Sequence, residues 1–176
     1  MSAPALETRR ITPDHYRAVM RHLPTGVAAI CSTDAVTGAQ NGMIVGTFAS
    51  LSMEPALVTF SVMHSSTSWP RMAEAANFSV NLLAEDQQQV CRALSAKGED
   101  KLRDVRWSES AWGTPHIHGS VAWFDCQVEQ HFVAGDHIVV IASVLEMTSG
   151  GGASDPLIFH GGRFGSFREP SLSPSL

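Results

Sequence analysis

The segment 41-NGMIVGTFASLSMEPALVTFS-61 indicates most about how this chain folds. An apolar run, Met43 to Val45, leads into small and hydroxylated residues, and a Met-Glu-Pro turn then starts a β-branched run at Leu57 to Val62. This pattern predicts two β-strands joined by a crossing with little side-chain bulk. Small residues at a strand end let a ligand approach the backbone, so we expect a ligand along residues 45–50. The same residue types are also usual in an ordinary strand connection, and composition alone leaves both interpretations open.

Size and composition predict one compact domain. The chain has 176 residues, of which 44% are apolar and 16% charged, and these values are typical of a single globular domain. The small number of charges indicates an apolar face that a second subunit covers. The net charge of −5, with both signs interspersed, argues against a nucleic acid as partner. No secretory apolar segment and no run of 18 apolar residues occurs, which disfavours secretion and membrane spanning.

The cysteines and histidines do not predict a metal site. Cys31, Cys91 and Cys126 are odd in number and include no CxxC pair, so we expect reduced thiols in the core of a cytoplasmic protein. His116 and His118 have the spacing of a metal-binding pair. No third ligand of matching spacing, no HExxH motif and no Cys/His cluster accompanies them.

Hydrophobic periodicity predicts a mainly β protein with a few helices. Thr12-Pro13-Asp14 starts a helix whose apolar face has helical spacing and which Pro24 ends; this face consists of Tyr16, Val19, Met20 and Leu23. Two further short helices are predicted, one after Trp69 and one opened by Glu85-Asp86. The predicted strands are 26–33, 43–45, 57–62, 78–83, 120–133, 137–147 and 156–159. So many strands argue for a closed antiparallel barrel with peripheral helices. A Rossmann sheet is disfavoured, because no GxGxxG follows a strand and opens a helix.

Two short motifs suit a charged or redox-active ligand. Ser65-Ser66-Thr67-Ser68 precedes a helix, where N–H donors, hydroxyls and the helix dipole suit a phosphate, although such residues also serve as ordinary N-caps. Gly135-Asp136-His137 forms a corner between two strands, for which turn chemistry is a sufficient explanation. Its imidazole is nevertheless well suited to donate a hydrogen bond or proton near neutral pH, and the adjacent carboxylate can orient it.

Taken together, these motifs resemble the short-chain flavin reductase family. GMIVGTFASLSMEPALV at 42–58 resembles the family signature GMTVSSFTSVSLxPPLV. It is accompanied, in the family's order, by HLPTGV at 22–27, FSVNLL at 78–83, GDH at 135–137 and PLIF at 156–159. The resemblance covers nearly the whole chain. It implies an antiparallel, Greek-key-like split β-barrel that binds flavin, at residues 12–168, between a flexible arm at 1–11 and a disordered tail at 169–176.

The resemblance implies an NAD(P)H:flavin oxidoreductase, in which hydride passes from nicotinamide C4 to flavin N5. FMN or FAD would be the flavin and NADH or NADPH the reductant. The implied flavin-binding residues are Thr25, Val45, Gly46, Thr47, Ser50, Ser65, Ser66, Thr67, Asn81, Asp136 and His137. Of these, His137 faces the nicotinamide and is the implied catalytic residue. Reduced flavin would pass to a separate oxygenase, and the protein would be a homodimer.

Two positions depart from the family pattern. Ile44 and Gly46 stand where the pattern usually has Thr and Ser. Loss of a hydroxyl donor weakens flavin binding by about 1 kcal/mol, unless a backbone N–H makes the contact instead. Flavin would then be a dissociable substrate more readily than a fixed prosthetic group.

Three alternatives remain open at the level of the sequence. The first is a flavin-binding split barrel without reductase activity, acting as a carrier or sensor. The second is an oxidase of a phosphorylated pyridoxine-like substrate, against which the Gly135-Asp136-His137 corner argues. The third is a structural dimer without a ligand.

Overall fold

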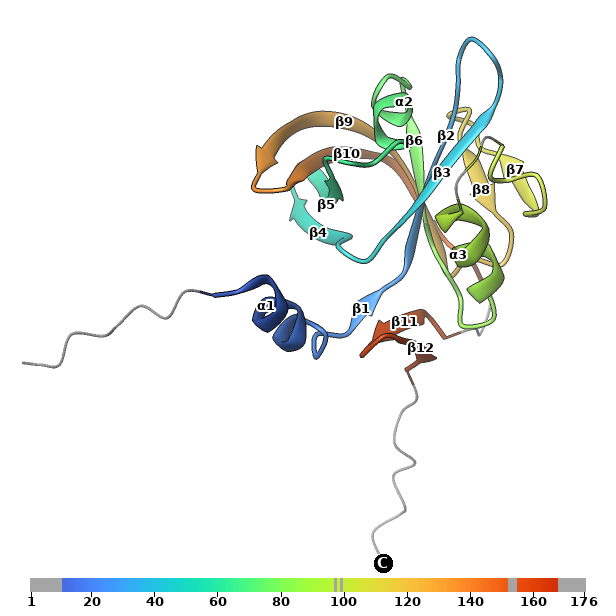
Figure 1. Cartoon of the computed structure of the whole chain (residues 1–176). Coiled ribbons are helices and arrows are strands. Elements are labelled where there is room, and N and C mark those ends of the chain that lie inside the picture. Colours follow the sequence, from blue (N-terminus) through green and yellow to red (C-terminus); the bar gives the residue numbers. More distant parts are fainter. Residues whose placement is uncertain (1–10, 97, 99, 152–154, 168–176) are drawn as a thin grey trace, which may run out of the picture.

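The computed structural model describes residues 11–96, 98, 100–151 and 155–167 (Figure 1). The predicted tail at 169–176, and the predicted arm at 1–11 apart from Ile11, lie outside the described residues. The elements in chain order are α1 Pro13–Met20, β1 Thr25–Gly26, β2 Ala28–Thr33, β3 Gln40–Val45, β4 Ala49–Met53, β5 Ala56–Met63, α2 Trp69–Ala73, β6 Phe78–Leu82, α3 Gln88–Ser95, β7 Trp107–Glu109, β8 Pro115–Ile117, β9 Ala122–Ala134, β10 His137–Ser149, β11 Leu157–His160 and β12 Arg163–Ser166.

A seven-stranded antiparallel sheet in the order β3-β2-β6-β9-β10-β5-β4 forms the body of the protein. A three-stranded sheet, β1-β11-β12, and the hairpin β7-β8 lie beside it. Figure 1 shows β9 and β10 curving strongly, so that the large sheet bends round on itself. Side chains of β3 and β5 meet in one core cluster, so the two sides of the sheet enclose a common interior. The predicted antiparallel split barrel is confirmed.

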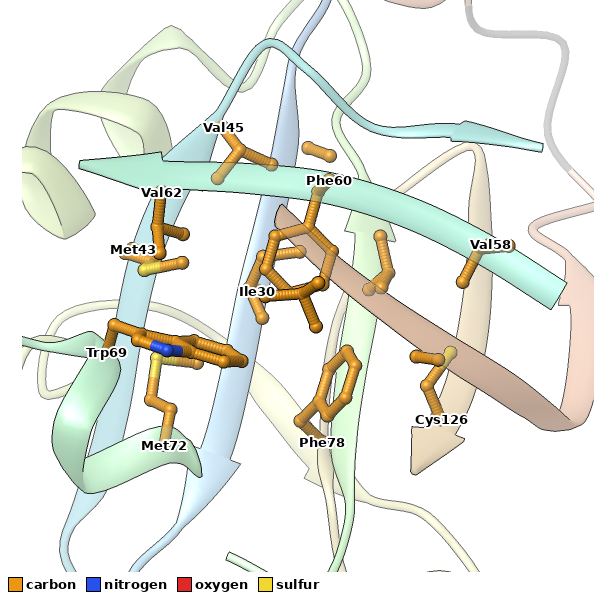
Figure 2. Close-up of a cluster of buried hydrophobic side chains, with 14 residues drawn as sticks. Ile30, Met43, Val45, Val58, Phe60, Val62, Trp69, Met72, Phe78 and Cys126 are labelled. Atoms are coloured by element: carbon orange, nitrogen blue, oxygen red, sulfur yellow. The ribbon is translucent and has the colours of Figure 1, made fainter. Parts of the chain in front are cut away.

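The interior of the barrel is packed around aromatic rings (Figure 2). Phe60 on β5 makes edge-to-face contacts with Trp69 and Phe78, at centroid distances of 5.6 and 5.8 Å. Met72 lies below Trp69 in the view, so that α2 supplies two of the core side chains. Aromatic pairs of this geometry contribute about 0.5–1.5 kcal/mol beyond their buried area.

A second cluster covers the outer face of the sheet. It joins β2 to α3 and to the strands near the C-terminus, through Ala29, Cys31, Leu83, Leu94, Ile117 and Leu157. Because alternate residues of a strand point to opposite faces, β2 contributes Ala28 and Ile30 to the interior and Ala29 and Cys31 to this outer cluster. A strand buried on both faces explains the unbroken apolar run in its sequence.

Three predicted boundaries are wrong. α1 ends at Met20, with Arg21 as C-cap, and not at Pro24. The stretch predicted as a crossing contains a strand, β4, which pairs with β5 through a register shift between Ser50 and Ser52. Pairing with a neighbour is what makes this segment extended, and small hydroxylated residues do not indicate such pairing by themselves.

The third error concerns the start of α3. The helix begins at Gln88, and Glu85 lies in the turn before it. The turn is held by one local and one distant bond of Gln87. Its Oε1 accepts from the N–H of Ala84 at 2.9 Å, and its Nε2 donates to the carbonyl of His118 at 2.8 Å. Together these bonds prevail over the preference of acidic residues for a helix N-terminus.

The three cysteines are free and buried, as predicted. Burial raises the pKa of Cys31 and of Cys126 to about 12, and it also raises the pKa of Cys91. Helices in the described part of the chain are all too short or too polar to cross a bilayer. Across the described residues, no three side chains among His, Cys, Asp and Glu are grouped so as to hold a metal ion.

We predict that Gly150→Ala destabilises the fold. A Cβ at this position would lie 2.1 Å from the carbonyl oxygen of Ser120 and 3.1 Å from that of Val121. Because both neighbours are backbone atoms, we expect the free energy of unfolding to fall by about 1–3 kcal/mol in a denaturant titration. The control Gly165→Ala, whose Cβ would meet no atom within 4 Å, should change it by less than about 0.5 kcal/mol. Equal losses in the two variants would contradict the prediction.

Candidate functional site

The corner between β9 and β10 holds an aspartate and a histidine in direct contact. Gly135 adopts a φ of 65°, a conformation that glycine tolerates best, and the turn pairs Ala134 with His137. Asp136 Oδ1 lies 2.7 Å from His137 Nδ1. The hydrogen bond and charge of His137 lower the pKa of Asp136, whose side chain is 86% exposed. The aspartate therefore orients the imidazole through Nδ1, and Nε2 is the ring nitrogen that does not contact the aspartate.

The sheet brings this corner next to the segment that follows β3. β10 pairs with β5 so that His137 lies opposite Met63, and the N–H of His64 donates to the carbonyl of Asp136 at 3.0 Å. Thr47 is bound to the same strand, because its hydroxyl accepts from the N–H of Ser61 at 2.9 Å and donates to the carbonyl of Ser61 at 3.1 Å. Thr47 and His137 are thus both held by β5.

A cavity of about 790 Å³ contains both groups. One side is lined by barrel residues that include Thr47, Ser61, Asp136 and His137. Another side is lined by α1 and the two residues before it, namely Ile11, Thr12, Pro13, Tyr16 and Arg17. The sequence did not predict a role for Tyr16 or Arg17 here. The amphipathic pattern of α1 was the available signal, and it indicated only packing.

A second cavity, of about 180 Å³, contains three more of the predicted residues: Thr25, Val45 and Gly46. The side chain of Val45 points into the barrel core (Figure 2), so only its backbone can meet a ligand. A Cβ on Gly46 would lie 2.9 Å from Thr25 Oγ1. A serine at position 46, as the family pattern has, would therefore require the Thr25 side chain to move.

A third cavity, of about 190 Å³, lies at the start of α2 and includes Thr67, Ser68, Arg71 and Lys101. Lys101 Nζ donates to Ser68 Oγ and to the carbonyl of Leu94, both at 3.0 Å, and burial lowers the pKa of this lysine. The hydroxyl cluster therefore lies beside two basic side chains.

The remaining predicted residues lie near these cavities or on the surface. Ser66 Oγ accepts from the N–H of Trp69, the first residue of α2, at 3.2 Å, whereas the N-cap Ser68 makes no side-chain capping bond. Ser65 is exposed in the loop after β5. Ser50 is exposed on β4, opposite Val58.

Comparison with known proteins agrees with this geometry. The sequence profile of the flavin reductase like domain matches residues 20–168. The chain belongs to this family. It is 42% identical over 157 residues to the flavin reductase of Pseudomonas putida, an alignment that covers 89% of this chain and 91% of that protein.

Other members of the flavin reductase family are similar over most of their length. FMN reductase (NADH) SmoA of Agrobacterium fabrum is 34% identical, over 86% of this chain and 84% of its own. HsaB of Rhodococcus jostii, a flavin-dependent monooxygenase reductase subunit, is 33% identical, over 97% and 86% respectively.

Solved structures show the same fold. Component B of nitrilotriacetate monooxygenase from Mycobacterium thermoresistibile superposes with a TM-score of 0.84 at 31% identity, covering 93% of this chain and 90% of that one. The NADH:FAD oxidoreductase SgcE6 of Streptomyces globisporus, in complex with NAD and FAD fragments, superposes with a TM-score of 0.83 at 27% identity, covering 93% and 99%.

Asn81 lines none of the three cavities described above. It is fully buried on β6, where Nδ2 donates to the carbonyls of Ala29 and Pro115, at 3.3 Å each. Its Oδ1 accepts from the N–H of Ile117 at 2.7 Å. No part of the side chain reaches the surface, which argues against the predicted contact of Asn81 with flavin. Its role is to join β2, β6 and β8.

The His-x-His pair also has a structural explanation. His116 Nε2 lies 3.0 Å from Asp125 Oδ2, and the imidazole stacks on Trp123 at a centroid distance of 5.8 Å. Asp125 is buried and also accepts from the hydroxyls of Ser110 and Thr114. His116 therefore helps to pair a buried carboxylate.

We predict that Asn81→Ala lowers stability without affecting flavin binding. Several buried polar groups would lose their partner, so the free energy of unfolding should fall by about 2–4 kcal/mol. FMN affinity, measured where the variant is folded, should stay within about threefold of the wild type, because the side chain lines none of the three cavities.

Asn77→Ala is a suitable control for this prediction. Asn77 Nδ2 makes an exposed bond to the carbonyl of Trp112 at 3.2 Å, so its loss should cost about 1 kcal/mol or less. A tenfold loss of FMN affinity in folded Asn81→Ala would return Asn81 to the flavin site.

Proposed function

We propose that this protein is an NAD(P)H:flavin oxidoreductase that reduces FMN or FAD and releases the reduced flavin to a separate monooxygenase. The observation that carries the proposal is the cavity in which β5 holds Thr47 together with the Asp136–His137 corner. The relatives support it, since their names include a flavin reductase, an FMN reductase (NADH) and a monooxygenase reductase subunit.

The residues at the end of β3 fit a flat heteroaromatic ligand. Gly46 has no side chain, and the Thr25 hydroxyl would lie 2.9 Å from a Cβ there, so the Thr25 side chain packs against the Gly46 backbone at this end of β3. The Thr47 hydroxyl is engaged with both backbone groups of Ser61, which fixes the crossing and leaves backbone groups as the contacts for a flavin. Near the start of α2, Arg71 and Lys101 accompany the hydroxyls of a predicted phosphate site.

In this mechanism the residues of the chain position the flavin and the nicotinamide. A bound flavin supplies the acceptor for hydride at N5. The backbone at Gly46 and Thr47 would hold a bound flavin, and the Asp136–His137 pair presents an imidazole whose orientation is set through Nδ1. Such an imidazole can hydrogen-bond to the carboxamide of a nicotinamide or to a flavin edge through Nε2, which aligns the two rings for transfer.

We also propose that flavin is a dissociable substrate. The absence of a hydroxyl at Gly46 and the engagement of the Thr47 hydroxyl by Ser61 together reduce the number of side-chain donors for the ligand. Each missing side-chain donor that a backbone N–H does not replace weakens binding by about 1 kcal/mol.

The proposal includes a homodimer in the cytoplasm. Large apolar side chains are exposed on β4 and at the end of β9: Leu51, Met53, Phe132 and Val133. A second copy would cover such a patch. The free, buried thiols suit the reducing compartment in which NAD(P)H is also available.

The test is NAD(P)H oxidation by purified protein in air, with and without FMN or FAD and with each nicotinamide in turn. Flavin-dependent oxidation is expected, together with a flavin dissociation constant above about 1 µM. Flavin binding without oxidation of either nicotinamide would contradict the proposed reductase activity and favour a function as flavin carrier or sensor. A submicromolar dissociation constant would contradict only the proposal that flavin is a dissociable substrate.

We predict that His137→Ala slows flavin reduction and leaves flavin affinity nearly unchanged. Loss of the oriented imidazole should lower the rate of NAD(P)H oxidation about tenfold or more, because the ring faces the reductant. The flavin dissociation constant should change less than about threefold. His131→Ala, on the exposed part of β9, is the control and should have wild-type activity. Unchanged turnover in His137→Ala would remove this residue from the mechanism.

A further inference from the structure

Helix α1 has an apolar face that packs on little of the described chain. Tyr16 is 56% exposed and Val19 54%, and Met20 and Leu23 are exposed as well. None of the eight residues of α1 is buried. Helices of this length are marginal in water unless an apolar face is packed, so a partner for part of this face is expected.

The position of α1 is set by its C-terminal end. Arg21 Nη2 donates to the carbonyl of Gly161, and the N–H of Gly161 donates to the carbonyl of Arg21, both at 3.1 Å. Figure 1 shows α1 beside the barrel, next to β1 and away from the packed strands. The helix is therefore joined to the β11-β12 hairpin at one end, while its first turns border the 790 Å³ cavity.

We propose that Tyr16 binds the nicotinamide nucleotide, with its ring against a heteroaromatic ring of the reductant. The inference rests on the proposed function. Tyr16 lines the same cavity as His137, the residue assigned to the reductant, although the two belong to opposite ends of the chain. Tyrosine supplies a rigid apolar face with a polar tip, which suits stacking on nicotinamide or adenine.

The distribution of space supports a reductant in this cavity. Of the residues predicted to hold flavin, Thr25, Gly46 and Thr67 line the cavities of about 180 and 190 Å³. Thr47, Asp136 and His137 line the cavity beside Tyr16, where flavin and reductant would meet. The cavity beside Tyr16 is about 790 Å³, which is large enough for a second nucleotide to bind. Arg17 lines it too, and its ion pair with Asp14 is exposed, so the guanidinium is accessible to a pyrophosphate.

The competing explanation is that a second copy of the chain covers α1. Val19 separates the two explanations, because it belongs to the same apolar face, is as exposed as Tyr16, and does not line the cavity. A subunit contact would involve both side chains, whereas a bound nucleotide would involve Tyr16.

The experiment compares Tyr16→Ala, Tyr16→Phe and Val19→Ala with the wild type. Calorimetry of FMN-saturated protein measures the dissociation constant of NAD⁺ or NADP⁺, whichever form the wild type uses, and kinetics measure KM for the reduced form. Tyr16→Ala should raise both about tenfold, and Tyr16→Phe, which keeps the ring, should stay within about threefold. Val19→Ala and the FMN affinity of all variants should stay within about twofold.

Either of two results would overturn the role of Tyr16. One is a nicotinamide affinity and KM in Tyr16→Ala within about twofold of the wild type. The other is an equal effect of Val19→Ala, accompanied by dissociation in sedimentation, which would assign the face to a subunit contact. Wild-type protein that binds FMN but oxidises neither nicotinamide would instead contradict the proposed function itself.

A second readout does not depend on turnover. Tyr16 is the single tyrosine of the chain and is exposed, so its nitration by tetranitromethane can be followed by mass spectrometry. Saturating NAD⁺ or NADP⁺ should protect Tyr16 in FMN-loaded protein. Nitration at an unchanged rate would contradict the proposal.

Discussion

Strand β10 is hydrogen-bonded along both edges, to β9 and to β5, and the position of the candidate site depends on this double pairing. The register places His137 opposite Ala134 on one side and opposite Met63 on the other. A slip of one residue would turn every side chain of the strand to the opposite face. Irregularities between Ile141 and Ala142, and between Val144 and Glu146, bend the β9-β10 pair, and the curvature lets one sheet enclose a core.

The fold separates polar groups that support structure from polar groups that meet solvent. Asn81 and Asp125 are buried, and each is surrounded by hydrogen-bond partners from distant segments. The Asp136–His137 pair lies at a hairpin end, where the two side chains bond to each other and border the cavity. Rigid buried networks can therefore hold the barrel while the reactive imidazole stays accessible, an arrangement typical of sites on loops carried by a stable scaffold.

Local patterns were sufficient for most of the barrel and for the Gly135-Asp136-His137 corner, because strand alternation and turn chemistry involve neighbours in the sequence. They were insufficient where a distant partner decides the structure. The start of α3 depends on the bonds of Gln87, and β4 depends on pairing with β5. A polar residue within an apolar strand can contact a ligand or belong to a buried hydrogen-bond network. For Asn81 the position of β8 decides for the buried network, and this position cannot be read from the strand's own sequence. Similarly, the spacing of Tyr16 indicated an apolar face but not the cavity beside it.

The burial of the three thiols affects how well the protein resists oxidation during turnover. Flavin that leaves a reductase in its reduced state reacts with dioxygen and produces hydrogen peroxide near the protein. Peroxide oxidises thiolates and not thiols, and burial raises the pKa of Cys31 and Cys126 to about 12, so these side chains stay protonated near neutral pH. The accessible sulfur atoms belong to methionines such as Met53 and Met63, whose sulfoxides can be enzymatically reversed. Within the part of the chain that the structure describes, the fold thus keeps its thiols in the core and leaves the repairable sulfur of methionine at the surface.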